Sequence, residues 1–413
     1  MIKKWKKNKF IVIILFIIVF LFPSAISRVS DYNARLICLG IGVDLTEEGY
    51  LFSVQSLVPE QTSSFKKNVN VHSASGQSVQ QSVKNLTTHL GKDIGLAHCA
   101  FIVVNDKVLD GELVNVIDFF IRKYQINYNS VVVATDKKAQ EVLSLSCKLN
   151  NSQGFGLNNI LAYNNQNLFS RSPNIENVYA SILGGSPYYA IDIITTSKKS
   201  EEGIDVKASS SQSGQSGNQG GNGDEEQDKD NVLVNNGDVF LMNKGQKLAI
   251  VNIEDNMGVR YINPSNNSFN LSIKNFTDDV FTNADIELNS AKKVQYNKYY
   301  FKDNVPIVEL NIVQYFNIIN VKQENYNEKM YSISQNGFSD KLAEACSKEI
   351  VNNINKGVDM LKTYSCDVSH VYNAFNKYDY YNFKAFIDSL NNKEEYFKYI
   401  KFVPNVTVKY YTD

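Results

Sequence analysis

The stretch from Ala34 to Val58, ARLICLGIGVDLTEEGYLFSVQSLV, decides how the first half of the chain folds. It begins with an apolar run that ends in Asp44, a pattern typical of a buried strand. After an acidic turn that ends at Gly49, the residues alternate between apolar and polar side chains. Because the two runs are separated only by this turn, the sequence predicts that they pair as a β-hairpin.

Strands and helices alternate in the residues that follow this hairpin. The apolar residues of 78–90 recur at helical spacing, and Ser78 is placed to cap the first turn of that helix. Short connections between alternating strands and helices predict a sheet that is covered by helices. We expect helices at 78–90, 113–122 and 136–145, and strands at 100–105 and 130–134.

A polar segment divides the chain. Residues 197–231, SKKSEEGIDVKASSSQSGQSGNQGGNGDEEQDKDN, lack aromatic side chains and contain too few apolar ones to bury. This composition predicts a disordered polar linker at 197–235. It separates an N-terminal α/β region at 28–196, which forms either one unit or two subdomains, from a C-terminal α+β domain at 236–413.

In the C-terminal domain the strands come first and most helices follow. Residues 237–251 contain two short apolar runs around an Asn-Lys-Gly turn, which indicates a second hairpin. Residues 342–361 form the clearest amphipathic helix of the protein, with six apolar residues on one face. Further strands are expected at 268–273, 293–299, 307–321 and 403–411, and shorter helices at 367–377 and 381–390. The fold class predicted for the whole chain is α+β, with mixed β-sheets packed with helices.

The first 27 residues have the layout of an export signal. Five of the first nine residues are lysines, and residues 10–22 then run without a polar side chain. This apolar run is shorter than the roughly 20 residues of a membrane span, but continuing it to Ser27 approaches that length. Residues 25–27 also resemble a small-x-small cleavage site before Arg28. We expect an exported multi-domain protein whose segment 1–27 is either a cleaved signal peptide or a retained signal-anchor helix, with retention slightly favoured.

Composition and charge argue against several classes of protein. The net charge is −1, so nothing predicts a nucleic-acid partner. Five cysteines without a C-x-x-C pair and four scattered histidines predict neither a disulfide framework nor a metal site. Most cysteines are expected to be small buried residues, although Cys346 and Cys366 flank one helix and could meet.

The sequence contains no recognisable catalytic signature such as G-x-S-x-G, a Walker A loop or H-E-x-x-H. Gly40 and Gly42 lack the third glycine of a dinucleotide loop and are interpreted as part of a strand. His98 is interpreted as a structural histidine, and Asp367 as a cap for the next helix. The tyrosines of 378–381 are interpreted as a half-buried edge. We therefore predict no catalytic, cofactor-binding or metal-binding residues and no enzyme activity.

Several stretches, taken in their order along the chain, resemble the C-subunit family of spore germinant receptors, the Ger(x)C proteins. The likeness spans nearly the whole exported part, and the helix at 342–361 and Asp367 also fit it. One departure is that the family usually has a lipobox cysteine, and here its position falls near Ser27. The stretches that carry the resemblance are 39–44 with 50–58, 95–98 with 101–104, 116–122, 237–250 and 406–411.

The resemblance implies a non-enzymatic subunit of a nutrient-sensing germinant receptor, required for spore germination. It would lie on the outer, exported face of the spore inner membrane, beside two integral-membrane subunits of the A and B types. Without a lipidated cysteine, the N-terminal apolar segment would provide the membrane attachment.

Two other functions remain open from the sequence. An exported solute-binding protein that captures a small molecule for a membrane partner would have a deep cleft with convergent polar groups. An exported cell-wall hydrolase would need a carboxylate pair or a metal cluster. The sequence does not decide whether the protein itself binds a small molecule.

Overall fold

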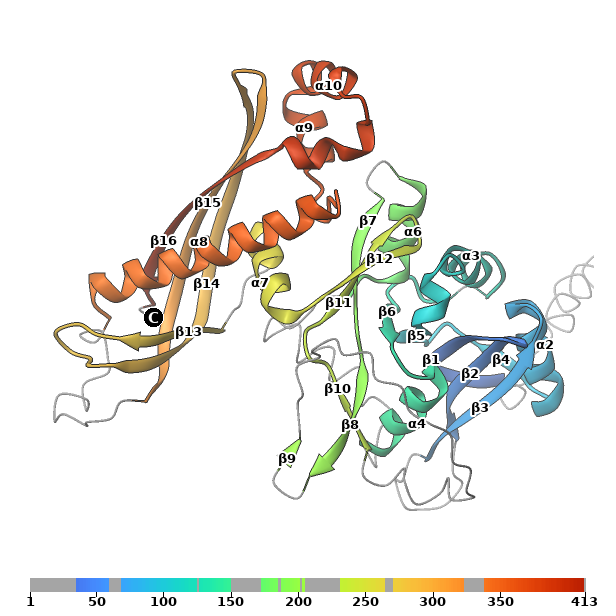
Figure 1. Ribbon diagram of the computed structural model, residues 1–413. Coiled ribbons are helices and arrows are strands. Elements are labelled where there is room, and N and C mark those ends of the chain that lie inside the picture. The colour runs from blue at the N-terminus through green and yellow to red at the C-terminus, as the bar shows by residue number, and fades with distance from the viewer. Residues whose placement is uncertain are drawn as a thin grey trace, which may run out of the picture.

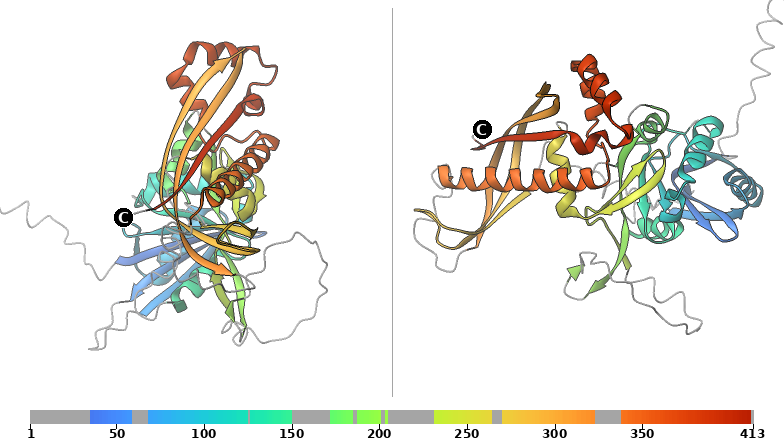
Figure 2. Two further views of the ribbon diagram at one scale, coloured as in Figure 1. Left: turned by 90° about the vertical axis from the view of Figure 1, so that its left-hand side faces the viewer. Right: turned by 45° about the horizontal axis from the view of Figure 1, so that its top comes forward.

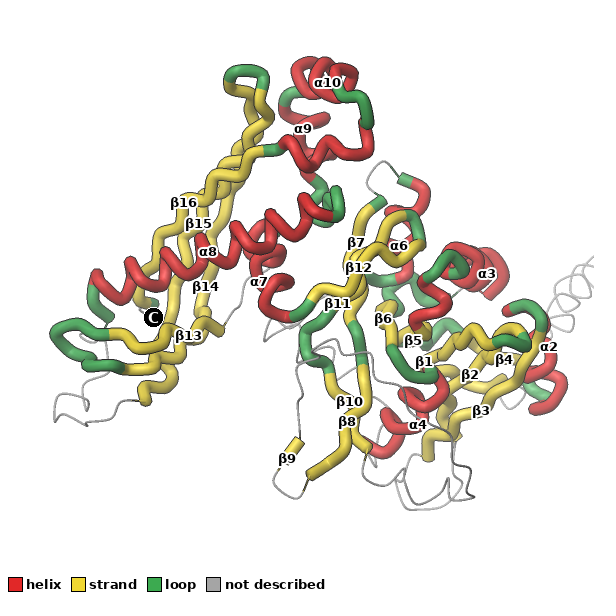
Figure 3. Tube along the Cα trace, in the orientation of Figure 1, coloured by secondary structure: helices red, strands yellow, loops and turns green. Residues whose placement is uncertain are grey.

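The computed structural model of the protein shows four β-sheets with helices packed around them (Figures 1 and 3). The predicted signal or anchor segment at 1–27 lies outside the described residues. Within the described part of the chain, no helix is long and apolar enough to span a membrane. The structure describes residues 35–58, 68–124, 126–149, 172–184, 187–200, 203–204, 231–263, 270–322 and 338–411.

The N-terminal group is a mixed sheet in the order β3-β2-β1-β5-β6, with β4 pairing to the start of β1. The predicted hairpin is confirmed, because β1 and β2 pair antiparallel through a tight turn at Gly49. Strands β5 and β6 continue the sheet in parallel. Strand β3 was missed, because its residues carry few apolar side chains. The strands are β1 (Arg35–Thr46), β2 (Gly49–Val58), β3 (Asn68–Gly76), β4 (Asp93–Gly95), β5 (Phe101–Asn105) and β6 (Val131–Thr135).

Helices cover both faces of this sheet. The side chains of β5 alternate, so that Ile102 and Val104 face the core under α2 (Val79–Leu90) and α3 (Leu113–Tyr124). Their neighbours Phe101 and Val103 face α4 (Ala139–Leu149). The predicted cap of α2 is confirmed, since the Ser78 side chain accepts a hydrogen bond from the Gln81 backbone.

Helix α4 begins three residues later than the sequence pattern predicts, and a buried carboxylate sets its start. Asp44 at the end of β1 is 1% exposed and accepts hydrogen bonds from the backbone N–H groups of Ala139 (2.6 Å) and Gln140 (3.2 Å). These are the orphan donors of the first turn of a helix. The position of α4 is therefore tied to the sheet by a contact that is distant in sequence.

The middle group of strands joins the two halves of the protein. It consists of β7 (Tyr188–Asp192), β11 (Val239–Asn243) and β12 (Gln246–Val251), which pair antiparallel in the order β12-β11-β7. The side chain of Phe240 belongs to the N-terminal core, and that of its neighbour Leu241 belongs to the C-terminal core. The middle sheet therefore contributes to both cores, and its two faces are oriented toward different parts of the molecule.

The predicted linker at 197–235 is wrong at both ends. Strand β8 (Thr195–Ser200) pairs antiparallel with β10 (Asn231–Val234), and the short β9 (Gly203–Ile204) pairs with β8. Backbone hydrogen bonds order these ends, and composition does not report such bonds. Residues 205–230 lie outside the described part of the chain.

The C-terminal group is a sheet in the order β13-β14-β15-β16, in which β14 and β15 form a long hairpin (Figure 2). The predicted strands are confirmed but are longer than expected. In the first half of β14 only alternate side chains are buried, so the apolar signal there is diluted by exposed polar residues. The strands are β13 (Asn270–Phe276), β14 (Ala284–Lys302), β15 (Val305–Lys322) and β16 (Lys401–Tyr410).

The predicted long helix, α8 (Asp340–Thr363), is confirmed and packs across this sheet (Figure 2). It crosses α7 (Ile253–Ile262), which the sequence did not predict, where Gly258 meets Gly357. A Cβ atom on Gly258 would lie 1.9 Å from the carbonyl oxygen of Asn353, so the two helices approach closely only because glycine stands there.

Two short helices, α9 (Val371–Tyr378) and α10 (Tyr380–Ser389), follow α8 and lie beside the tip of the hairpin (Figure 1). Their Phe375 and Phe383 rings stack at 5.0 Å. A further helix that was not predicted, α6 (Ile175–Leu183), precedes β7. With its mixed sheets and packed helices, the protein has the predicted α+β multi-domain fold.

Candidate functional site

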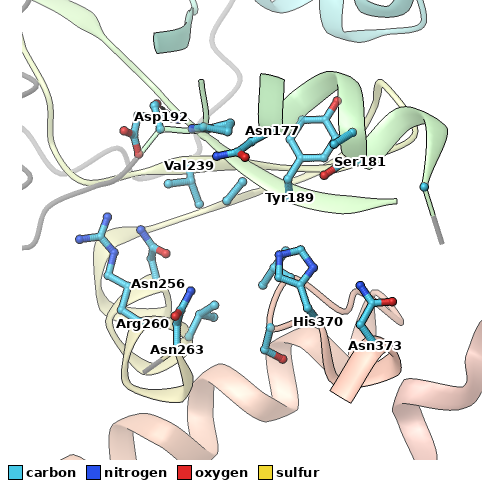
Figure 4. A pocket seen from close by; sticks show the side chains of 18 residues that line it. Asn177, Ser181, Tyr189, Asp192, Val239, Asn256, Arg260, Asn263, His370 and Asn373 are labelled. Atoms are coloured by element: carbon cyan, nitrogen blue, oxygen red, sulfur yellow. Dashed lines mark hydrogen bonds between the residues drawn. The ribbon is translucent and has the colours of Figure 1, made fainter. Parts of the chain in front are cut away.

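A cavity of about 730 Å³ lies between the two halves of the protein. One wall is formed by α6 and β7, and the opposite wall by α7 and the segment that leads into α9 (Figure 4). The volume is within the range of pockets that hold small molecules, roughly 300–1,000 Å³. This pocket is the candidate functional site.

Two helices present polar faces to the pocket. From α6 come Asn177 and Ser181, four residues apart. From α7 come Asn256 and Arg260, also four residues apart, and its C-cap residue Asn263 follows three residues later. Residues three, four and seven apart lie on one face of a helix. Each helix therefore presents one stripe of side chains to the space between them.

The two ends of the pocket differ in burial. At the deep end, Asp192 is 2% exposed, Asn256 5% and Arg260 9%. At the other end, His370 and Asn373 are exposed. Figure 4 shows Asp192 and Arg260 together at one end and His370 and Asn373 at the other. Charged groups thus occupy the deep end, and neutral amides and an imidazole line the entrance.

Asp192 is the last residue of β7, where the strand leaves the middle sheet. Its backbone N–H donates a hydrogen bond of 3.0 Å to the Ser172 hydroxyl. Burial raises the pKa of its carboxyl group to about 6, while the Ser172 hydroxyl and the positive charge of Arg260 act in the opposite direction. Its Oδ2 atom has no hydrogen-bond partner in the described part of the chain.

Arg260 supplies a positive charge opposite this carboxylate. Burial lowers its pKa to about 10, and the attraction of Asp192 partly compensates for that effect. The guanidinium therefore stays protonated at neutral pH. The deep end contains one cationic and one anionic side chain in an environment where charge interactions are stronger than in water.

The position of α7 is set by short contacts to the middle sheet. The Asn256 side-chain amide donates a hydrogen bond of 2.9 Å to the Gly237 carbonyl, and the Ile253 backbone N–H donates one of 3.0 Å to the Asp238 carboxylate. Gly237 has a φ of 83°, and a Cβ atom there would lie 2.9 Å from Ile253. These contacts hold the polar stripe of α7 against the end of β11.

The entrance is shaped by Asp367, whose carboxylate caps the first turn of α9 as predicted, although the N-cap residue of that helix is His370. Its fully buried carboxylate accepts hydrogen bonds from the Val371 and Tyr372 backbone N–H groups, both at 2.8 Å, and from the Tyr396 hydroxyl at 2.6 Å. The three residues that follow Asp367 line the pocket, and the last of them, His370, adopts a φ of 57°. The capped turn thus positions His370 at the pocket entrance.

The other residues examined in the sequence lie away from this pocket. Gly40 and Gly42 lie inside β1, where a Cβ atom on Gly40 would be 2.2 Å from the Phe101 ring, so the strand interpretation is confirmed. The interpretation of His98 as a structural histidine is wrong, because the residue lies exposed in a turn. The buried strand begins three residues after it, at Phe101.

The four cysteines whose side chains the structure describes, Cys38, Cys99, Cys346 and Cys366, are buried as predicted, and the last two do not pair with each other. Burial raises the pKa of the Cys346 thiol to about 12. The tyrosines of 378–381 are more exposed than the predicted half-buried edge, with Tyr381 84% exposed. Among the described residues, no group of three or more His, Cys, Asp or Glu side chains is arranged to hold a metal ion.

Sequence reasoning missed nearly all of the pocket. No role had been assigned from the sequence to any of its polar residues, including Asp192 and Arg260. The available signal was the helical spacing of residues 253–262 after Asn252, whose side chain caps the helix by accepting a hydrogen bond from the Asp255 backbone. Even with that helix predicted, its partners across the pocket would have remained unknown, because they lie about 70 residues away in sequence.

Comparison with known proteins places this fold among proteins of spore germination. Residues 28–196 match the family model for the spore germination protein N-terminal domain, and residues 237–410 match the model described as spore germination B3/GerAC-like, C-terminal. Together the two models match most of the chain, which therefore belongs to the Ger(x)C family of germinant receptor proteins. The family predicted from the sequence is confirmed.

A solved structure, the crystal structure of the GerBC protein, has a similar fold. The two structures superpose with a TM-score of 0.52 over 90% of this chain and 97% of that chain, at 12% sequence identity. At this identity the likeness concerns the fold alone. No curated protein matches the sequence.

Proposed function

We propose that this protein is the C subunit of a nutrient germinant receptor and has no catalytic activity of its own. It acts at the outer face of the spore inner membrane beside two integral-membrane subunits of the A and B types. The observation that carries the proposal is the match of both family models, in order, to residues 28–196 and 237–410.

The surroundings of the chemically versatile side chains support a non-enzymatic role. The carboxylates of Asp44 and Asp367 accept backbone N–H groups at the starts of α4 and α9. The Cys346 and Cys366 thiols are buried, and burial raises the pKa of both. A thiol in such surroundings is a poor nucleophile, because the thiolate is the reactive form.

The experiment that tests the receptor role is a germination assay on spores that lack this gene. The deletion is made in a strain without a second receptor for the same nutrients, and a wild-type copy restored in trans is the control. We expect the deletion to abolish the response to at least one nutrient. A normal response to every nutrient would overturn the proposal.

The proposed attachment to the membrane is tested separately. We propose that the apolar segment at 1–27 is retained as a signal anchor, since no cysteine is present there to carry a lipid. Mass spectrometry of the protein purified from spores should then find peptides from the lysine-rich start. A mature N-terminus at Arg28 would show that the segment is cleaved.

A second candidate function is the capture of a small molecule, and the pocket is the observation that favours it. Deep burial of Asp192, Asn256 and Arg260 at one end of a 730 Å³ cavity is the convergence of polar groups that a solute-binding protein needs. The two functions are distinguished by the deletion strain. Loss of uptake of a solute with an unchanged germination response would favour the second.

A further inference from the structure

We propose that the pocket between the two halves binds a small zwitterion, whose ammonium group pairs with Asp192 and whose anionic group pairs with Arg260. This inference deepens the small-molecule candidate and does not depend on the receptor role. It rests on the buried Asp192 oxygen that has no partner among the described residues, on the positive charge of Arg260 near it and on the residues that line the cavity.

The first step concerns the Asp192 carboxylate. Its Oδ2 atom is buried and has no hydrogen-bond partner among the described residues. Leaving a buried acceptor unpaired costs roughly 1–3 kcal/mol, and more when the group is charged. Among the described residues three other carboxylates are buried, and all of them accept hydrogen bonds: those of Asp44, Asp238 and Asp367. The fold can therefore supply donors to a buried carboxylate. In the described part of the chain, the one buried carboxylate oxygen without a donor is that of Asp192, which lines the cavity.

The second step concerns the charge of the missing donor. A carboxylate in a buried site is best paired by a cationic donor, because charge-assisted hydrogen bonds are about twice as strong as neutral ones. Arg260 stands at the same end of the pocket and would repel a simple amine. A simple carboxylate would meet Arg260 but would be repelled by Asp192. A molecule with both charges supplies the donor that Asp192 Oδ2 lacks, places its anionic group near the positive charge of Arg260 and avoids both repulsions.

The third step concerns the size and shape of the site. The buried end is also lined by Asn256, whose side-chain amide already donates a hydrogen bond to the Gly237 carbonyl. The other end of the cavity is lined by Asn177, His370 and Asn373, which are exposed, so a side group of the ligand can extend toward solvent there. The charged part of the ligand is thus placed inward and its variable part outward.

The placement of the two charges has a consequence for coupling. Asp192 belongs to the segment that matches the N-terminal family model, and Arg260 to the segment that matches the C-terminal one. A ligand that pairs with both would link the two halves of the protein. Binding would then stabilise one relative position of those halves. Such a shift in the population of arrangements can carry a signal from one half to the other.

The test is a binding assay on the full-length chain purified in detergent, by saturation-transfer NMR and calorimetry near pH 7.5. The probes are three zwitterions of increasing length (glycine, β-alanine and 4-aminobutyrate) together with ethylammonium, acetate and glycerol. We expect at least one zwitterion to bind saturably and at least about tenfold more tightly than the three single-function probes. If ethylammonium binds as tightly as the zwitterions, the proposed contact between the ligand's anionic group and Arg260 is overturned. If acetate binds as tightly, the proposed contact between the ligand's ammonium group and Asp192 is overturned. Saturable binding by none of the zwitterions would overturn the whole inference.

Two variants of matched chemistry locate the site. Asp192→Asn keeps the shape of the side chain and removes its charge, and we expect it to weaken zwitterion binding by about tenfold to a hundredfold. Asp118→Asn makes the same change at a partly exposed residue of α3 that does not line the pocket, and it should leave binding unchanged. Circular dichroism confirms that both variants are folded. Unchanged affinity in Asp192→Asn would place the ligand elsewhere and overturn the proposal, whereas the germination phenotype of the deletion strain tests the receptor role independently.

Discussion

The turn around Asp367 and the end of β7 around Asp192 each bury a carboxylate, but only one of the two is fully paired. Asp367 accepts hydrogen bonds from two backbone N–H groups and a tyrosine hydroxyl. Asp192 retains an oxygen without a partner in the described part of the chain and faces a cavity. The difference teaches that burial of a charge does not by itself mark a site. The completeness of its hydrogen bonding separates a structural carboxylate from one that is available to a ligand.

The largest effect is expected from Asp367→Ala. The substitution leaves the N–H groups of Val371 and Tyr372 and the Tyr396 hydroxyl without their shared acceptor in a buried turn. We expect a loss of about 3–5 kcal/mol in the free energy of unfolding, measured by urea denaturation. Asp388→Ala on the exposed face of α10 is the control and should leave the denaturation midpoint unchanged. A loss below about 1 kcal/mol would show that the turn does not depend on this carboxylate.

Asp192→Asn is expected to increase the free energy of unfolding in the absence of ligand, in contrast to Asp367→Ala. The folded-state pKa of about 6 is above the unfolded value of about 3.9, so folding takes up a proton between these pH values. Stability therefore falls as pH rises from 4 to 6, and above pH 6 the wild type carries the whole cost of the buried charge. At pH 7 the substitution should stabilise the protein by about 1–3 kcal/mol. The gain is smaller than the pKa shift alone predicts, because Arg260 loses the negative charge beside it.

The pH profile isolates this one group. Arg260, Tyr189 and His370 are other ionisable residues that line the pocket, and Asp192→Asn leaves all three in place. The difference between the wild-type and variant stability curves, measured in urea from pH 4 to 8, should rise to a plateau above pH 6. A difference that stays constant across this range would show that Asp192 does not titrate there.

A smaller loss is expected from Tyr396→Phe. The substitution removes one of the four groups that donate to the Asp367 carboxylate and leaves the ring in the cluster that it forms with Tyr372 and Phe383. We expect a loss of about 1–2 kcal/mol in unfolding free energy, because the two backbone donors remain. If the loss equals that of Asp367→Ala, the hydroxyl rather than the helix cap stabilises the turn.

The smallest effect is expected from Asp44→Asn. The amide oxygen can still accept a hydrogen bond from the backbone of Ala139 or Gln140, so only part of the cap at the start of α4 is lost. A cost of about 1 kcal/mol is typical of such a change. Hydrogen exchange should quicken in the first turn of α4 and stay unchanged in α2, which has its own cap at Ser78. Uniform quickening in both helices would contradict a local role.

Much of the fold could be predicted where one segment carries its own signal. The hairpin of β1 and β2, the capped helix α2 and the long helix α8 each show a local period that matches the face they bury. The helices α6 and α7 are short, and β3 is polar, so their local signals were too weak. Elements that are short or poor in apolar residues were therefore the ones that the sequence did not predict.

The candidate site was much less predictable than the fold. Its charged residues, Asp192 and Arg260, are separated by 68 positions and by the polar segment that was predicted to be a linker. They come together because β7 pairs with β11, with Asp192 opposite Val239, and because α7 follows β12. No local period encodes that pairing.

The sequence by itself determined the family, the strongest secondary-structure elements and the capping role of Asp367. These depend on motifs and periods within short windows, where burial of one face imposes a repeat on neighbouring residues. Only the tertiary structure decided that the middle sheet contributes to both cores and that opposite charges meet in a cavity beside it. The physical reason is that strand register and helix packing bring distant residues together, and the free energy that fixes them is spread over contacts that no single segment contains.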